Sequence, residues 1–204
     1  MRFPAALDYL RAAEKPTRDA HPKAREREQW WKPSRSVQDT FAAIGPLTRW
    51  IACPATGKRF PMVWCEPAWC PSNAISVFGV LSSRLHQVWA TEVSTKLKGD
   101  PRYTTASFAT FPFPWRDPAQ VTTIEASARA IVGLRRSFCD ADGLGLTKLY
   151  NAVDEGAYTD LAAAHRTLDL AVCDSYGWQH STLDTIEGIV DALLALNADI
   201  ASGT

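Results

Sequence analysis

The stretch RYTTASFATFPFPW (102–115) places a β-rich run directly before a segment of alternating aromatic residues and prolines. Proline has no backbone N–H to donate to a sheet ladder, so Pro112 should end a strand over residues 103–110. Adjacent apolar rings usually fill a core, and we interpret Phe111, Phe113 and Trp115 as a packed, proline-stiffened joint. The alternative is that these rings stack on unpaired bases.

The joint also separates two halves of opposite charge. Residues 1–116 hold 17 Lys and Arg against 9 Asp and Glu, whereas residues 117–204 hold 5 against 13. A basic half is typical of a polyanion-binding surface, although the two halves could simply attract each other. We therefore predict two domains, 1–116 and 117–204.

The C-terminal half has the pattern of a small helical bundle. A helix is predicted from Pro118, with Asp117 as its N-cap and Gln120 completing a capping box. A second helix is predicted from about Thr159 to a C-cap at Gly177, and a third after residue 181. The segment GLGLTKLY (143–150) offers at most a short helix. The apolar face of the first helix consists of Ile124, Ala128, Ile131 and Leu134.

The N-terminal half is mixed. Helices are predicted over residues 3–13, about 22–31 and 35–46, and the runs 47–54 and 59–67 predict a β-hairpin. A strand near Ile75 should become a helix by Leu81, because apolar residues then recur at helical spacing. The whole chain is therefore predicted to be α+β: a small mixed or antiparallel sheet with helices, followed by an all-α bundle.

Several short motifs give the chain a resemblance to a known family. It resembles the C-terminal part of MmeI-like and BREX-type DNA adenine methyltransferases of bacterial restriction-modification and phage-defence systems, over residues 3 to about 180. Each motif is weak alone, and their order and spacing carry the resemblance. The motifs are SSRLH (82–86), KLK (96–98), RYT (102–104), FPFP (111–114) and AHRTLD (164–169).

The resemblance implies that residues 1–116 are part of a DNA target-recognition domain and that 117–204 are a C-terminal helical domain. The Asn-Pro-Pro-Tyr/Phe tetrapeptide that binds the flipped adenine in such enzymes is absent from the sequence. No glycine-rich strand-to-helix loop offers a place for S-adenosylmethionine. We therefore expect no cofactor in this chain, and a catalytic domain that binds S-adenosylmethionine upstream or as a separate chain.

The predicted DNA-binding residues combine two kinds of side chain. Arginine and glutamine can read base edges, whereas lysine and arginine neutralise phosphates. Each of these residues could instead belong to a solvated surface. For the alternating charges from Lys23 to Arg35 we favour surface ion pairing. The predicted DNA-binding residues are Arg84, Gln87, Thr91, Lys96, Lys98, Arg102, Lys58 and Arg59.

Other candidate chemistries are weaker. His86 and His165 lie within amphipathic helices, where a histidine is usually a hydrogen-bonded packing residue, and neither has an adjacent Ser or Cys nucleophile in an elbow motif. The spacing of Cys53, Cys65 and Cys70 matches no common zinc pattern. We expect no metal and no catalytic residue. The five cysteines suit a reducing compartment, and no apolar run is long enough for a membrane helix, so a cytoplasmic protein is expected.

Two functions from different classes follow. The first is the sequence-recognition part of a site-specific adenine-N6 methyltransferase, bound to double-stranded DNA and to a catalytic domain. The alternative is a non-enzymatic interaction module whose basic half associates with nucleic acid. A sequence-specific DNA-binding protein loses roughly 1–3 kcal/mol of binding free energy per wrong base pair. A protein that binds only the phosphate charges loses little.

Overall fold

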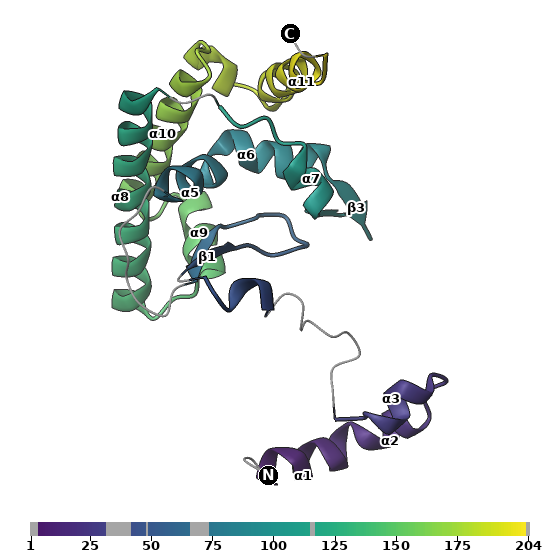
Figure 1. Cartoon of the computed structure of the whole chain (residues 1–204). Helices are drawn as coiled ribbons and strands as arrows, with labels where there is room; N and C mark the ends of the chain where they lie inside the picture. Colours follow the sequence, from purple (N-terminus) through teal and green to yellow (C-terminus); the bar gives the residue numbers. More distant parts are fainter. Residues whose placement is uncertain (1–3, 32–41, 48, 66–73, 115–116, 203–204) are drawn as a thin grey trace. The chain divides into compact units, whose positions relative to one another are not determined.

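The computed structural model describes the whole chain except residues 1–3, 32–41, 48, 66–73, 115–116 and 203–204 (Figure 1). The chain forms two compact units, residues 1–48 and residues 49–204. Helices predominate, and the described residues include two small antiparallel sheets of two strands each, both of them before the helices of the C-terminal half. The predicted α+β class is confirmed.

The first unit consists of short helices: α1 Pro4–Ala13, α2 Lys15–Asp19 and α3 Ala24–Glu28. The predicted helix over 3–13 is confirmed, and the one over 22–31 is shorter than expected. Glu26 forms an ion pair with Arg18, which precedes the segment for which surface ion pairing was predicted, and both side chains of the pair are mostly buried. Of the helix predicted over 35–46, residues 42–44 are helical and 45–46 form a turn; residues 35–41, and Lys32 before them, lie outside the described residues.

The second unit begins with the predicted hairpin. Strands β1 (Trp50–Ala52) and β2 (Val63–Cys65) are antiparallel, with Ile51 opposite Trp64. A second hairpin pairs β3 (Thr95–Leu97) with β4 (Asp100–Arg102). Its turn residues Lys98 and Gly99 both have positive φ, as a two-residue type I′ turn requires. The sequence analysis did not predict this second hairpin.

The segment from 74 to 93 is helical except at Ser83, whose backbone is extended, and this corrects the predicted strand near Ile75. Helix α5 (Ala74–Ser82) is followed by α6 (Arg84–Val88) and by a π-helical turn, η1 (Trp89–Val93). A mostly apolar run of this length can form a strand or a buried helix, and the pattern alone does not decide between them. Here Ile75, Phe78 and Leu81 are all buried in one core cluster, at helical spacing.

The strand predicted over 103–110 is also wrong. A short helix, α7 (Thr105–Ala109), follows β4 directly. Its N-cap is Thr104, whose hydroxyl accepts a hydrogen bond from the N–H of Ser107 at 3.2 Å. A hydrogen bond from a backbone N–H to a threonine side chain three residues earlier favours a helix start over a strand. This local bond therefore begins α7 where a strand was predicted.

The helices of the C-terminal half are close to the prediction. They are α8 (Pro118–Asp142), α9 (Leu146–Asp154), α10 (Thr159–Ser175), the 3₁₀ turn η2 (His180–Leu183) and α11 (Ile186–Ser202). Asp117 caps α8 by accepting from the N–H of Ala119 at 2.7 Å. Gln120 does not complete a capping box; it donates to the carbonyl oxygen of Asp174 instead. Gly177 has the positive φ of a C-terminal cap.

Helices α8 and α10 lie side by side, and α5 packs across α8 (Figure 1). One core cluster joins Leu85 and Trp89 to Ile124, Ile131 and other residues of the C-terminal helices. The predicted boundary between 116 and 117 therefore lies inside the second compact unit. The division into a recognition part and a helical part stays a prediction about function.

The aromatic joint is packed as predicted where the structure describes it. Phe111 is 4% exposed and meets the rings of His86 and Phe113 edge to face, at centroid distances of 4.9 and 5.1 Å. Phe113 packs against both core clusters. Trp115 lies outside the described residues. No helix among the described residues has the length and apolarity needed to cross a membrane.

Candidate nucleic-acid interface

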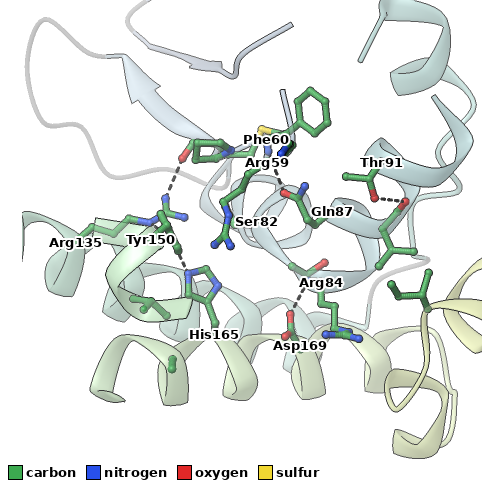
Figure 2. Close-up of a pocket in the computed structure, with 18 residues that line it drawn as sticks. Arg59, Phe60, Ser82, Arg84, Gln87, Thr91, Arg135, Tyr150, His165 and Asp169 are labelled. Atoms are coloured by element: carbon green, nitrogen blue, oxygen red, sulfur yellow. Dashed lines mark hydrogen bonds between the residues drawn. The ribbon is translucent and has the colours of Figure 1, made fainter. Parts of the chain in front are cut away.

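A pocket of about 440 Å³ opens in the second unit between the β1–β2 connection, α6 and the helices α8 to α10 (Figure 2). Five of the eight predicted DNA-binding residues line it. These are Lys58, Arg59, Arg84, Gln87 and Thr91. Residues up to 33 positions apart in the sequence are thus brought to one concave surface. Its lining includes four cationic side chains and the carboxyl group of Asp169; the cations are Lys58, Arg59, Arg84 and Arg135.

The other three predicted residues lie elsewhere. Lys96, Lys98 and Arg102 are exposed on the β3–β4 hairpin and do not line the pocket. The hairpin is tied to the β1–β2 connection: the N–H of Tyr103 donates to Ala55 and the N–H of Gly57 donates to Pro101. The two basic loops, one at Lys58 and one at Lys98, are therefore joined by backbone hydrogen bonds.

Gln87 is held by the loop that it faces. Its Oε1 accepts a hydrogen bond from the N–H of Phe60 at 3.2 Å, and Phe60 is buried in the core. This bond fixes the loop between β1 and β2 against α6. It also occupies one acceptor site of the amide, so the Nε2 amino group is the part of Gln87 left for a ligand.

Arg84 opens α6 and is exposed, as a contact residue should be. Its backbone N–H donates to Oδ1 of Asp169 at 2.7 Å. Burial raises the pKa of Asp169 to about 6, while hydrogen bonding to Arg84 and the charges of Arg84 and Arg166 act in the opposite direction. The carboxylate thus anchors α10 to the start of α6 and leaves the guanidinium of Arg84 at the pocket.

One wall of the pocket is a hydrogen-bonded chain that the sequence analysis missed. The Nε of Arg135 donates to the hydroxyl of Tyr150 at 2.6 Å, and the same hydroxyl lies 2.6 Å from Nε2 of His165. Since the Tyr150 oxygen accepts from an arginine, which is always a donor, its own proton is available for His165 Nε2. Figure 2 shows the three side chains on one side of the pocket and Arg84 and Thr91 on the other.

The surroundings of His165 keep its imidazole ring neutral. Burial first, and then the positive charges of Arg135 and Arg59, lower the pKa of His165 to about 4. His165 was interpreted as a hydrogen-bonded packing residue; it does make that bond, but it also faces the pocket. The sequence could have indicated that Arg135 is buried, because it follows Ile124, Ala128 and Ile131 at helical spacing on the apolar face of α8.

His86 fits the packing interpretation fully. It is buried, and its Nε2 lies 2.6 Å from the hydroxyl of Tyr103. Among the residues that the structure describes, no group of three or more His, Cys, Asp or Glu side chains could hold a metal ion. Cys53 and Cys65 are free thiols, and Cys70 lies outside the described residues.

Comparisons with known proteins agree with the resemblance. Residues 66–115 match the protein family described as the MmeI target recognition domain. DNA methyltransferase A of Bacillus subtilis (strain 168) is 31% identical over 123 residues, which make up 60% of this chain and 13% of that relative. The resemblance stated from the sequence is confirmed: residues 66–115 are similar to the MmeI target recognition domain.

The fold is similar to a solved one. The structure of the type IIL restriction-modification enzyme MmeI in complex with DNA matches with a TM-score of 0.75 and 23% sequence identity. The match covers 98% of this chain and 27% of that one. The chain therefore spans about a quarter of the solved relative and a smaller share of the curated one.

Proposed function

We propose that this chain, with its target-recognition region of the MmeI type, docks on duplex DNA and reads a short sequence for a DNA adenine-N6 methyltransferase. The catalytic domain, with S-adenosylmethionine, would be supplied upstream or by a separate chain. The observation that carries the proposal is the convergence of Lys58, Arg59, Arg84, Gln87 and Thr91 on one pocket, next to a hairpin that carries further cations.

The positions of these residues favour separate roles in phosphate binding and in base recognition. Lys96 on β3 and Lys98 in the turn after it are both exposed, where they can follow a phosphate strand without sequence preference. Arg84 is exposed at the pocket and has the fork geometry that pairs with guanine in the major groove. Gln87 is held in place by Phe60, so its amino group is preorganised to donate to a base acceptor.

The test is competition binding of the full chain to a randomised duplex library at two salt concentrations. Lys96→Ala and Lys98→Ala should weaken binding to all duplexes and reduce the salt slope by about one unit each. Arg84→Ala and Gln87→Ala should instead reduce preference at one base position, by roughly 1–3 kcal/mol.

A matched control is Lys148→Ala, which removes the same charge from the exposed face of α9. It should leave both the salt slope and the preferred sequence unchanged. Uniform loss of affinity in all four variants, with no sequence preference in the parent chain, would favour the interaction module and contradict the proposed reader.

The missing catalytic elements can be tested separately. The chain contains neither the catalytic tetrapeptide nor a glycine loop for S-adenosylmethionine. Calorimetric titration of the chain with S-adenosylmethionine should therefore give no saturable heat. Micromolar binding would show that the cofactor site is in this chain and would overturn that part of the proposal.

A further inference from the structure

Arg135 is a buried cation with an unusual set of partners. Its residue surface is 7% exposed, in the middle of α8. Its Nε donates to the hydroxyl of Tyr150, and its Nη1 donates to the carbonyl oxygen of Met62 at 2.9 Å. Both partners are neutral, and none of the ion pairs found among the described residues includes Arg135.

An unpaired buried charge is costly. Removing an ion from water costs several kcal/mol, and proteins normally offset this with an opposite charge or a full set of hydrogen bonds. The guanidinium has five N–H donors, and its Nη2 makes no hydrogen bond to the residues that the structure describes. The fold therefore leaves the Nη2 donors of Arg135 without a protein partner and its positive charge without a counter-ion among the described residues.

A second guanidinium increases this local excess of positive charge. Arg59 and Arg135 lie over the ring of Tyr150, at 5.2 and 5.1 Å from its centroid. The ring attracts both cations, but it cannot neutralise them. Arg59 forms an ion pair with Asp154, whose side chain is more than half exposed and whose charge is therefore screened by water.

The pocket opens on this cluster. Arg59 and Arg135 both line it, together with Lys58 and with Ser82, whose Oγ is buried and has no hydrogen-bond partner among the described residues. The nearest carboxylate that lines the pocket, Asp169, is already bound by the N–H of Arg84. The site thus combines two guanidinium groups, a lysine and open space, which is a composition that recognises a phosphate group.

We propose that Arg135, with Arg59 and Lys58, forms a phosphate-binding subsite in this pocket. The source of the phosphate rests on the proposed function: it is a backbone phosphate of the bound duplex. Arg135 would donate from Nη2 to a phosphate oxygen, and Arg59 would turn from Asp154 towards the same anion. The helical part of the chain then contacts DNA itself, in addition to supporting the recognition part.

The first experiment uses the full chain and inorganic phosphate, with sodium chloride at equal ionic strength as the reference. We compare Arg135→Met with Arg136→Met, a neighbour on α8 whose side chain is 83% exposed. Phosphate should raise the melting temperature of the parent chain and of Arg136→Met saturably, by a few degrees. Arg135→Met should show no such rise. The same melts show whether Arg135→Met is folded.

The second measurement stays valid if Arg135→Met fails to fold. In the parent chain, the NMR signal of the Arg135 Nε–H, assigned by through-bond correlation from its own backbone amide, should shift on addition of phosphate and also on addition of a short duplex. A merely structural arginine would not respond to either. An Arg135 signal that does not move with phosphate would overturn the subsite.

A third arm identifies the source of the phosphate. Arg135→Met should lower duplex affinity at least about tenfold more than Arg136→Met, although both variants lose one charge. Equal affinities would overturn the assignment to the DNA backbone and leave a site for free phosphate. The two proposals can fail independently, because loss of sequence preference contradicts the proposed reader, whereas a silent phosphate titration contradicts the subsite alone.

Discussion

Gly79 of α5 lies so close to Ile124 of α8 that a Cβ atom built on the glycine would be 2.6 Å from Cγ2 of Ile124. No side chain fits at that distance, so the two helices can cross here only because residue 79 has none. The contact links α5 to α8, and it is one of the contacts by which residues on both sides of the predicted domain boundary form one compact unit.

Gly79→Ala should therefore destabilise the protein by about 1–3 kcal/mol, the usual cost of overpacking a core. Gly133→Ala is the matched control, since Gly133 lies within α8 with open space around it. That variant should be more stable than the parent by about 1 kcal/mol, through helix propensity. Chemical denaturation measures both, and a destabilised Gly133→Ala or a neutral Gly79→Ala would contradict the packing described.

Phe111→Ala should cost about 3–5 kcal/mol, because it empties a buried aromatic site between His86, Trp89 and Phe113. Phe108→Ala, at a ring that is 41% exposed, should cost less than about 1 kcal/mol. If Phe111→Ala keeps its stability but loses affinity for nucleic acid, the ring stacks on bases and is not a packing residue.

Acid should destabilise the fold through its two buried histidines. Burial is the main cause that lowers the pKa of His86 and of His165 from 6.5 to about 4. Between these values the unfolded chain binds a proton at each site and the folded protein does not, so stability falls as the pH falls from 6.5 towards 4. The loss is on the order of 3 kcal/mol per histidine. An NMR titration that shows either ring protonating near pH 6.5 would contradict this.

Asp169 should act in the opposite direction over much of the same range. Burial raises its pKa from 3.8 to about 6, so the folded protein binds a proton more tightly than the unfolded chain, and stability falls as the pH rises from 4 to 6. Asp169→Asn keeps an oxygen that can accept from the N–H of Arg84 and removes the titration.

The stability of Asp169→Asn relative to the parent should therefore rise over this interval, by at most about 3 kcal/mol. Denaturation of both proteins at pH 4, 5 and 6 isolates the effect, because the histidine contributions cancel in the difference. A difference that does not change with pH would show that folding leaves the pKa of Asp169 unchanged, and would contradict the effect of burial.

The sequence by itself determined the elements whose signals are local and periodic. The α8 start at Asp117 and Pro118, the end of α10 at Gly177, the β1–β2 hairpin and the α+β class follow from caps, turn residues and hydrophobic spacing. The ordered motifs were enough to indicate the MmeI-type recognition region. These features are readable because each depends on residues that are near one another in the chain.

Only the tertiary structure decided the remaining features. Apolar runs such as ISVFGVLS satisfy a strand or a buried helix equally well, and packing of α5 on α8 selected the helix. The pocket depends on residues far apart in sequence, and Arg135 meets Met62 and Tyr150 only after folding. Whether a charged side chain is solvated or buried beside a cavity depends on which surfaces come together, and local spacing carries no information about that.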